Sequence, residues 1–286
     1  MAKDFIVAID LGSSKMTGIA GRKNPDGSIS ILAVAKEDSA SYIRKGVAYN
    51  IERTAQGLSN IVSKLKNTLK TEIEQVYVGI GGQSIHSVKN SIVKELPLDC
   101  IVSQDMVNEL MDTNRSMEYK DCEILDAITQ EYNVDGHYED DPVGIQARHL
   151  EGNFLNVLWR RSFYRNLNKS LDNSGIKVAE MYLAPLTMAD CVLTDAEKRA
   201  GCVLVDLGAD TTTVSVYYRN KLRHIAVLPL GGSNVTKDLE SLQIDEINAE
   251  AMKLKHASAL TNEKDIDADA TLPTGDGRTI PSRMFI

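Results

Sequence analysis

Two short acidic–glycine segments carry the residue types that hold a metal-bound phosphate. The first, Asp10-Leu11-Gly12-Ser13-Ser14-Lys15, follows an apolar run. The Asp10 carboxylate can hold Mg²⁺, usually through water, because Mg²⁺ keeps part of its hydration shell. Gly12 lets the backbone approach phosphate oxygens without an intervening side chain, and successive N–H groups in such a turn attract anions. Taken alone, the segment favours a plain hairpin turn, because Asp-Leu-Gly is a common sequence.

A second segment of the same design lies far along the chain and reads Asp206-Leu207-Gly208-Ala209-Asp210-Thr211-Thr212. Two such loops facing each other across a cleft can clamp a polyphosphate and its metal from both sides. Because the Asp-Leu-Gly turn recurs in matched strand contexts, the pair favours nucleotide binding over two unrelated turns.

The elements that must position these loops repeat as well. Residues 6–22 and 202–219 both begin with an apolar, β-branched run, as a buried strand does, and resume as an alternating strand after Asp-Leu-Gly. Turn residues and a third strand-like run follow each of them. We therefore expect two related α/β domains, each opening with a meander. A helix after the first meander is predicted by apolar residues at steps of three and four, namely Ala55, Leu58, Val62, Leu65 and Leu69.

Residues 84–161 break this pattern with short strand candidates, a polar helix candidate and an acidic turn at 139–141. We interpret them as an inserted α+β subdomain that ends near Trp159, a core residue followed by two exposed arginines. A helix capped by Gly175, the strand KVAEMYL and a helix over 186–199 come next. DEINAEAMKLKHASAL predicts a further helix, and the polar tail from 261 has no period. The predicted domains are 1–83 with 162–200, the insertion 84–161, and 201–286.

Composition narrows the class of protein. The chain has 286 residues, 43% of them hydrophobic, and a formal net charge of −8. That charge argues against nucleic-acid binding, which requires a basic surface. The cysteines, Cys100, Cys122, Cys191 and Cys202, form no CxxC pair and are expected to be free thiols in a reducing cytosol. The first residues are too short and too charged for a signal peptide, and no apolar run approaches the ~20 residues of a membrane span.

The paired loops resemble the phosphate 1 and phosphate 2 motifs of the actin, chaperone and sugar-kinase superfamily. Actin, MreB and DnaK-type chaperones carry their extra subdomain between the third strand and the first helix, but here the stretch from Lys36 to Arg53 is too short for one. The insertion instead follows VYVGIGG, which is a mark of the FtsA and PilM families. IRKGVAYNIE, VYVGIGGQSIHS, ITQEYNVD, VLTDAEKRAGCVLVDLG and NAEAMKLKHASAL are also similar to FtsA. The chain thus resembles the FtsA family from residue 4 to about 280.

This resemblance implies a site for ATP and Mg²⁺, with Asp10 and Asp206 facing the metal. In the family's pattern, Glu250 and Lys253 match positions that contact ribose and adenine, although an ordinary i,i+3 surface ion pair is the alternative. The implied nucleotide-binding residues are Asp10, Gly12, Ser13, Ser14, Lys15, Asp206, Gly208, Ala209, Asp210, Thr211, Thr212, Gly231, Gly232, Ser233, Glu250 and Lys253.

Two positions depart from the superfamily's pattern. Asp210 replaces the later glycine of the second loop, where its carboxylate either repels a phosphate or helps to hold the metal. Ala184, in the joining segment 181–185, stands where actin and the chaperones carry a Glu or Gln that orients the attacking water. Since such a group is often worth ~10²–10⁴ in rate, we expect ATP binding with at most slow hydrolysis, and we assign no catalytic residue.

As a function, the resemblance implies an actin-like cell-division scaffold. Such a protein polymerises, recruits FtsZ to the inner face of the membrane at the septum, and signals to later division proteins through the insertion. The family's Gly-Gly adenosine motif and membrane-binding amphipathic C-terminal helix are not seen after residue 233, so we expect an FtsA shortened at its C-terminus. A PilM-like pilus adaptor remains an alternative. A sugar-kinase-type phosphotransferase is another, but it requires a carboxylate base that the joining segment lacks.

Overall fold

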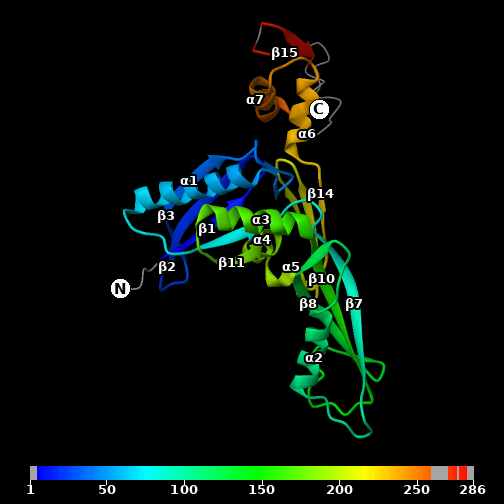
Figure 1. The fold of residues 1–286 in the computed structure, drawn as a ribbon. Helices are drawn as coiled ribbons and strands as arrows, with labels where there is room; N and C mark the ends of the chain where they lie inside the picture. The colour runs from blue at the N-terminus through cyan, green and yellow to red at the C-terminus, as the bar shows by residue number, and fades with distance from the viewer. Residues whose placement is uncertain (1–4, 259–269, 276, 282–286) are drawn as a thin grey trace. The chain divides into compact units, whose positions relative to one another are not determined.

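The computed structural model describes residues 5–258, 270–275 and 277–281 (Figure 1). These residues form two compact units, Met1–Pro229 and Leu230–Ile286, and each is considered by itself. Both candidate phosphate loops belong to the first unit, whereas Gly231 to Ser233, Glu250 and Lys253 belong to the second.

A five-stranded sheet forms one half of the first unit, with strand order β11-β6-β1-β2-β3. β1 (Ile6–Leu11), β2 (Lys15–Lys23) and β3 (Ile29–Asp38) are the predicted antiparallel meander. β6 (Val76–Ile80) and β11 (Val178–Leu183) run parallel to β1. The carboxyl ends of these three parallel strands therefore meet at one edge, where ligands bind in open α/β sheets.

Helix α1 (Ile51–Leu69) packs on this sheet beside α3 (Arg161–Ser174) (Figure 1). α1 begins at Asn50, whose side chain accepts a hydrogen bond from the Arg53 N–H, and ends at a left-handed Lys70. Its predicted apolar stripe is confirmed. Gly18 of β2 allows the close approach, because a Cβ there would lie 2.4 Å from the Ile61 side chain. α3 ends at the left-handed Gly175, as predicted.

The second sheet has seven strands, in the order β12-β13-β14-β7-β10-β8-β9. The second predicted meander supplies β12 (Cys202–Leu207), β13 (Thr212–Tyr218) and β14 (Lys221–Leu228). The insertion supplies β7 (His86–Glu95), β8 (Cys122–Val134), β9 (His137–Glu139) and β10 (His149–Arg160). The two sets join through the pairing of Ala226 with His86.

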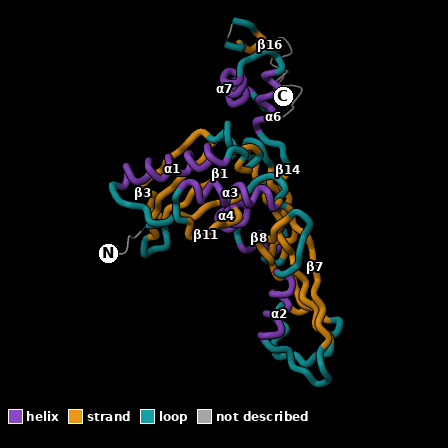
Figure 2. The backbone as a smooth tube through the Cα atoms, viewed as in Figure 1, coloured by secondary structure: helices purple, strands orange, loops and turns teal. Residues whose placement is uncertain are grey.

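Helix α2 (Gln104–Arg115) packs on β7, β8 and β10, and Figure 2 shows it lying along these long strands. The expectation of only short strands in the insertion was wrong, since β8 has 13 residues and β10 has 12. β10 tolerates a fully buried Asn156 because the Asn156 amide exchanges hydrogen bonds with Asn114 of α2 and donates to the Tyr119 hydroxyl. Trp159 is a core residue at the end of β10, as predicted.

Two shorter features of the first unit complete it. The hairpin β4 (Ile43–Arg44) and β5 (Val47–Ala48) lies between β3 and α1. The helix predicted over 186–199 is instead two helices, α4 (Ala184–Val192) and α5 (Asp195–Ala200). The break occurs because Leu193 is extended and Thr194 starts α5 with a capping box to Glu197.

The second unit contains α6 (Gly232–Glu240) and α7 (Glu246–His256), packed through Leu239, Ile244, Ala249 and Met252. β15 (Thr271–Pro273) and β16 (Thr279–Pro281) form a hairpin. The prediction of an irregular tail was therefore wrong for these residues. The helix predicted through 260 ends earlier, at His256, because Ala257 is extended, and residues 259–260 and the rest of the tail prediction lie outside the described residues. Among the described helices, none is long and apolar enough to cross a membrane.

Candidate functional site

The two acidic–glycine segments are the turns of two hairpins with the same register. β1 and β2 pair Asp10 with Thr17 and Leu11 with Met16. β12 and β13 pair Asp206 with Thr213 and Leu207 with Thr212. Every residue number in the second hairpin exceeds its counterpart in the first by 196. The repeat seen in the sequence is thus a repeat of backbone pairing, with each aspartate at the same place in its strand.

Both glycines occupy turns that are too tight for a side chain. A Cβ on Gly12 would lie 2.5 Å from the Lys15 carbonyl oxygen, and one on Gly208 would lie 2.9 Å from the Thr211 carbonyl oxygen. In the second turn, the Gly208 N–H donates to that Thr211 oxygen at 2.8 Å. The two loops therefore present bare backbone at matching positions, which fits a phosphate group better than a side-chain-filled turn does.

Asp10 lies within electrostatic reach of Asp206. Burial raises the pKa of Asp10, the negative charge of Asp206 raises it further, and the Leu11 N–H partly offsets both. Asp10 pairs with Gly79 of β6, and a Cβ on Gly79 would lie 3.5 Å from Asp10 Oδ1 and 3.7 Å from the Ala184 Cβ. A carboxylate whose charge is disfavoured by burial and by a second negative charge favours a divalent cation nearby.

The described residues contain no group of three or more His, Cys, Asp or Glu side chains that could hold a metal ion. Two carboxylates suit Mg²⁺, which usually binds through one or two of them together with water and substrate phosphates. The residues present therefore fit a metal-bound polyphosphate rather than a metal held by protein alone.

Ser39, which no sequence pattern singled out, supports the first loop from behind. It is fully buried, its hydroxyl donates to the Gly12 carbonyl oxygen at 2.6 Å, and its N–H donates to the Ser14 carbonyl oxygen at 3.2 Å. Ser13 is also buried, and its Oγ accepts from the Gly46 N–H at 2.8 Å. Ser14 and Lys15 are exposed at the mouth of the turn.

The two departures from the family pattern lie in this region too. Asp210 Oδ2 accepts a hydrogen bond from the Lys45 N–H at 3.0 Å, so the second loop contacts the turn between β4 and β5. Ala184 starts α4 next to Asp10 and Gly79, where it presents only a methyl group. Ala209, Thr211 and Thr212 complete the second loop and are half-buried.

The remaining predicted residues form a cluster in the second unit. The Lys253 ammonium donates to the Gly232 carbonyl oxygen at 3.1 Å, to Thr236 Oγ1 at 2.8 Å and to Glu250 Oε2 at 2.6 Å. Hydrogen bonds from Lys253 and Thr236 lower the pKa of Glu250. Glu250 and Lys253 are therefore part of a network that ties α7 to the start of α6, beyond a simple surface pair. Gly231 and Ser233 flank Gly232 at that start.

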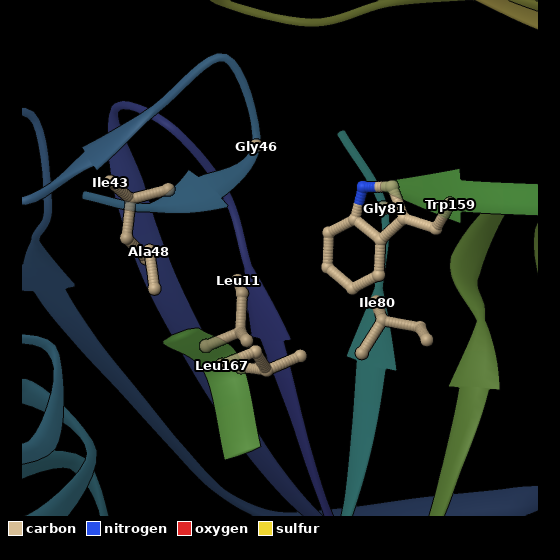
Figure 3. Close-up of a pocket in the computed structure, with 8 residues that line it drawn as sticks. All are labelled: Leu11, Ile43, Gly46, Ala48, Ile80, Gly81, Trp159 and Leu167. Atoms are coloured by element: carbon tan, nitrogen blue, oxygen red, sulfur yellow. The ribbon is translucent and has the colours of Figure 1, made fainter. Parts of the chain in front are cut away.

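A small apolar cavity of about 10 Å³ lies beside the first loop, between the β4–β5 hairpin and Trp159 (Figure 3). This volume is about that of one water-sized probe. Its lining includes Leu11, Gly46, Ile80 and Trp159. The cavity is far too small for a nucleotide.

Two family models match this chain, and both concern one family. The model described as "Cell division protein FtsA" matches residues 203–283. The model described as "SHS2 domain inserted in FTSA" matches residues 82–158, which contain β7, α2, β8, β9 and nearly all of β10.

Curated relatives carry the same name. The cell division protein FtsA of Porphyromonas gingivalis is 35% identical over 260 residues, covering 90% of this chain and 54% of the relative. FtsA of Escherichia coli K12 is 27% identical over 281 residues, covering 96% of this chain and 66% of the relative. The chain thus spans about half to two thirds of the length of these relatives.

Solved structures with the same fold are more distant in sequence. A PilM–PilN type IV pilus biogenesis complex has a TM-score of 0.59 at 14% identity, covering 87% of this chain and 69% of that chain. MreB5 of Spiroplasma citri bound to ADP has a TM-score of 0.52 at 10% identity, covering 99% of this chain and 73% of that chain. These likenesses show an actin-like α/β fold, as expected from the sequence. The two FtsA-specific models and the curated relatives place the chain in the FtsA family of cell division proteins.

Proposed function

We propose that the chain binds Mg·ATP between its two phosphate loops and serves as the nucleotide-dependent part of an actin-like cell-division scaffold. One observation carries this proposal: two hairpins of identical register present bare glycine turns, and their aspartates are close enough for one charge to raise the pKa of the other. Carboxylates far apart on separate surfaces would have removed its basis.

In this proposal each part of the site has a distinct task. Asp10 and Asp206 hold Mg²⁺, in part through water, and the metal neutralises phosphate charge. The backbone N–H groups of residues 12–15 and 209–211 bind phosphate oxygens, and Gly208, whose own N–H donates to Thr211, leaves room for them. By the family resemblance, Glu250 and Lys253 are assigned to the ribose and adenine, and the glycine turn from Gly231 to Ser233 precedes a helix N-terminus that favours anions. The proposed domains are 1–83 with 162–200, the insertion 84–161, and 201–286.

We infer that the nucleotide acts mainly as a structural ligand. Ala184 offers no hydrogen-bonding group beside Asp10, and no carboxylate or amide side chain occurs in the joining segment 181–185. Water near the phosphates is then left without a side chain from this segment to orient it, which keeps hydrolysis slow. The main effect of bound nucleotide is then to stabilise the folded form by mass action, rather than to be hydrolysed.

For the longer family protein, the proposal extends to assembly. The protein polymerises, tethers FtsZ to the cytoplasmic face of the membrane at the septum through an amphipathic helix, and contacts later division proteins through the insertion. Because PilM shares the fold, the competing function is a pilus adaptor. Binding to the C-terminal peptide of FtsZ, measured against a peptide of a pilus partner, separates the two functions; binding to the pilus peptide alone would exclude the scaffold.

Calorimetric titration of Mg·ATP into this chain tests the site. We expect saturable binding that is lost, or weakened at least about tenfold (about 1.4 kcal/mol), in Asp10→Ala and Asp206→Ala. Asp112→Ala in α2 is the matched control, because the exposed Asp112 carboxylate makes no hydrogen bond or ion pair with the described residues. Unchanged affinity in both loop variants would refute the proposed site.

A further inference from the structure

The turn between β4 and β5 contacts both phosphate loops at once. Lys45 and Gly46 have φ angles of 51° and 73°, the left-handed pair that a two-residue type I′ hairpin turn requires. The Lys45 N–H donates to Asp210 of the second loop at 3.0 Å, and the Gly46 N–H donates to Ser13 of the first loop at 2.8 Å. Each of the two turn donors therefore serves a different loop.

The opposite side of the same turn contacts the start of the insertion. The Lys45 carbonyl oxygen accepts from the Gln83 N–H at 2.8 Å. Backbones touch here: a Cβ on Gly46 would lie 2.4 Å from the Gly82 Cα, and a Cβ on Gly82 would lie 2.6 Å from the Gly46 carbonyl oxygen. A shift of the turn must therefore move residues 82 and 83 with it, because close-packed backbone cannot absorb it.

Gln83 also contacts the end of β10, the long strand of the insertion. Its carbonyl oxygen accepts from the Trp159 indole N–H at 3.1 Å, and the Arg160 N–H reaches Ser84 Oγ at 3.4 Å. Trp159 is buried at the end of β10, which pairs with both β7 and β8. The small cavity lies between Trp159 and the hairpin, and both Gly46 and Trp159 line it (Figure 3).

We propose that the Lys45–Gly46 turn is a relay that transmits the occupancy of the phosphate loops to β10 of the insertion through Gln83 and Trp159. The nucleotide step rests on the proposed function. Negative charge entering the loops repels the Asp210 carboxylate and weakens its hydrogen bond to Lys45, which loosens the turn. The segment from residue 82 to the start of the insertion then becomes more mobile. By reciprocity, a partner that holds the base of the insertion shifts nucleotide affinity.

Trp159 is the only tryptophan in the chain, so its fluorescence reports on the relay directly. Without nucleotide, Asp210→Ala is expected to increase amide exchange at Lys45 and Gln83 and acrylamide quenching of Trp159, relative to Asp112→Ala. This comparison does not depend on nucleotide binding. An unchanged Trp159 environment in Asp210→Ala would overturn the relay even if the chain binds ATP.

The second arm adds Mg·ATP to the unaltered chain and follows binding by calorimetry and the relay by Trp159 quenching and exchange in β10. We expect Trp159 quenching and β10 exchange to rise with Mg·ATP concentration and to reach half of their change at the concentration that half-saturates binding. Binding without such a rise refutes the relay but leaves the nucleotide site standing, whereas absence of binding refutes the proposed function and this nucleotide step together.

Trp159→Phe tests the link from Gln83 to β10, because phenylalanine keeps a buried ring but cannot donate to the Gln83 oxygen. We expect Mg·ATP binding within about twofold of the unaltered chain, and at least a twofold smaller exchange response in β10. Tyr164→Phe is the control, since the Tyr164 ring lies edge-on to Trp159 and its hydroxyl makes no hydrogen bond with the described residues. An undiminished response in Trp159→Phe contradicts the relay.

Discussion

Asp210 and Lys45 are 165 positions apart in the chain, yet the Asp210 carboxylate accepts a hydrogen bond from the Lys45 N–H at 3.0 Å. The superfamily's pattern has a glycine at the place of Asp210. The carboxylate therefore adds a contact between the second loop and the β4–β5 turn, and it places a negative charge beside the proposed phosphate site.

Removing that charge should strengthen nucleotide binding. Asp210→Asn keeps an acceptor oxygen for Lys45 but removes the repulsion between the carboxylate and a phosphate. We expect the Kd for Mg·ATP to fall about 3- to 10-fold, which corresponds to about 0.7–1.4 kcal/mol. Calorimetry measures it, with Asp112→Asn as the control. Weaker binding in Asp210→Asn would mean that this carboxylate helps to hold the metal.

Alanine at either loop glycine should weaken Mg·ATP binding, and the effect should be larger where the added Cβ lies closer to a backbone atom. Gly12→Ala places a Cβ 2.5 Å from a backbone oxygen and Gly208→Ala places one at 2.9 Å. We expect both to weaken Mg·ATP binding, Gly12→Ala the more strongly, with strain of about 1–3 kcal/mol in each turn. Gly81→Ala is the matched control, because a Cβ there meets no atom within 4 Å. Equal affinities in all three variants would argue against a glycine cradle.

Asp10 should make the stability of the ligand-free chain depend on pH. Burial and then the charge of Asp206 raise its pKa in the folded state above the ordinary value. The folded chain therefore holds the Asp10 proton more tightly than the unfolded chain does. The contribution is favourable at acidic pH and is lost as the pH rises from the ordinary aspartate range through the folded-state value.

Asp10→Asn removes this dependence. We expect it to raise the thermal midpoint of the ligand-free chain at pH 7 and to leave it nearly unchanged near pH 4, while abolishing Mg·ATP binding. Scanning calorimetry at the two pH values measures the effect, with Asp112→Asn as the comparison. A lower midpoint at pH 7 would show that the Asp10 carboxylate stabilises the fold without a ligand.

Lys253 should matter for the second unit whether or not it touches a nucleotide. An ammonium group has three donors, and three acceptors surround that of Lys253. Lys253→Met should destabilise the α6–α7 pair by about 1–3 kcal/mol, seen as faster amide exchange in both helices. Lys255→Met is the matched control, because Lys255 is exposed and makes no polar contact with the described residues. Unchanged exchange in α6 would contradict a structural role.

Much of the fold could be predicted because its signals are local. The apolar stripe of α1, the left-handed glycine that ends α3, and the two meanders each depend on neighbours within a few residues. The errors also have local causes. The capping box at Thr194 was present in the sequence as Thr-Asp-Ala-Glu and splits the helix that was predicted as one. The long strand β10 was not predicted, because Gly152, Asn153 and Asn156 interrupt its apolar residues.

By itself, the sequence determined the family, the actin-like fold class and the two hairpins that carry the aspartates, because repeated local patterns encode backbone pairing. Only the tertiary structure decided that Asp206 acts on Asp10, that Ser39 supports Gly12, and that one turn joins Ser13 to Asp210. These contacts connect single polar groups across many residues of chain. A hydrogen bond between two such groups leaves no period in the sequence, so only the packing of the elements reveals it.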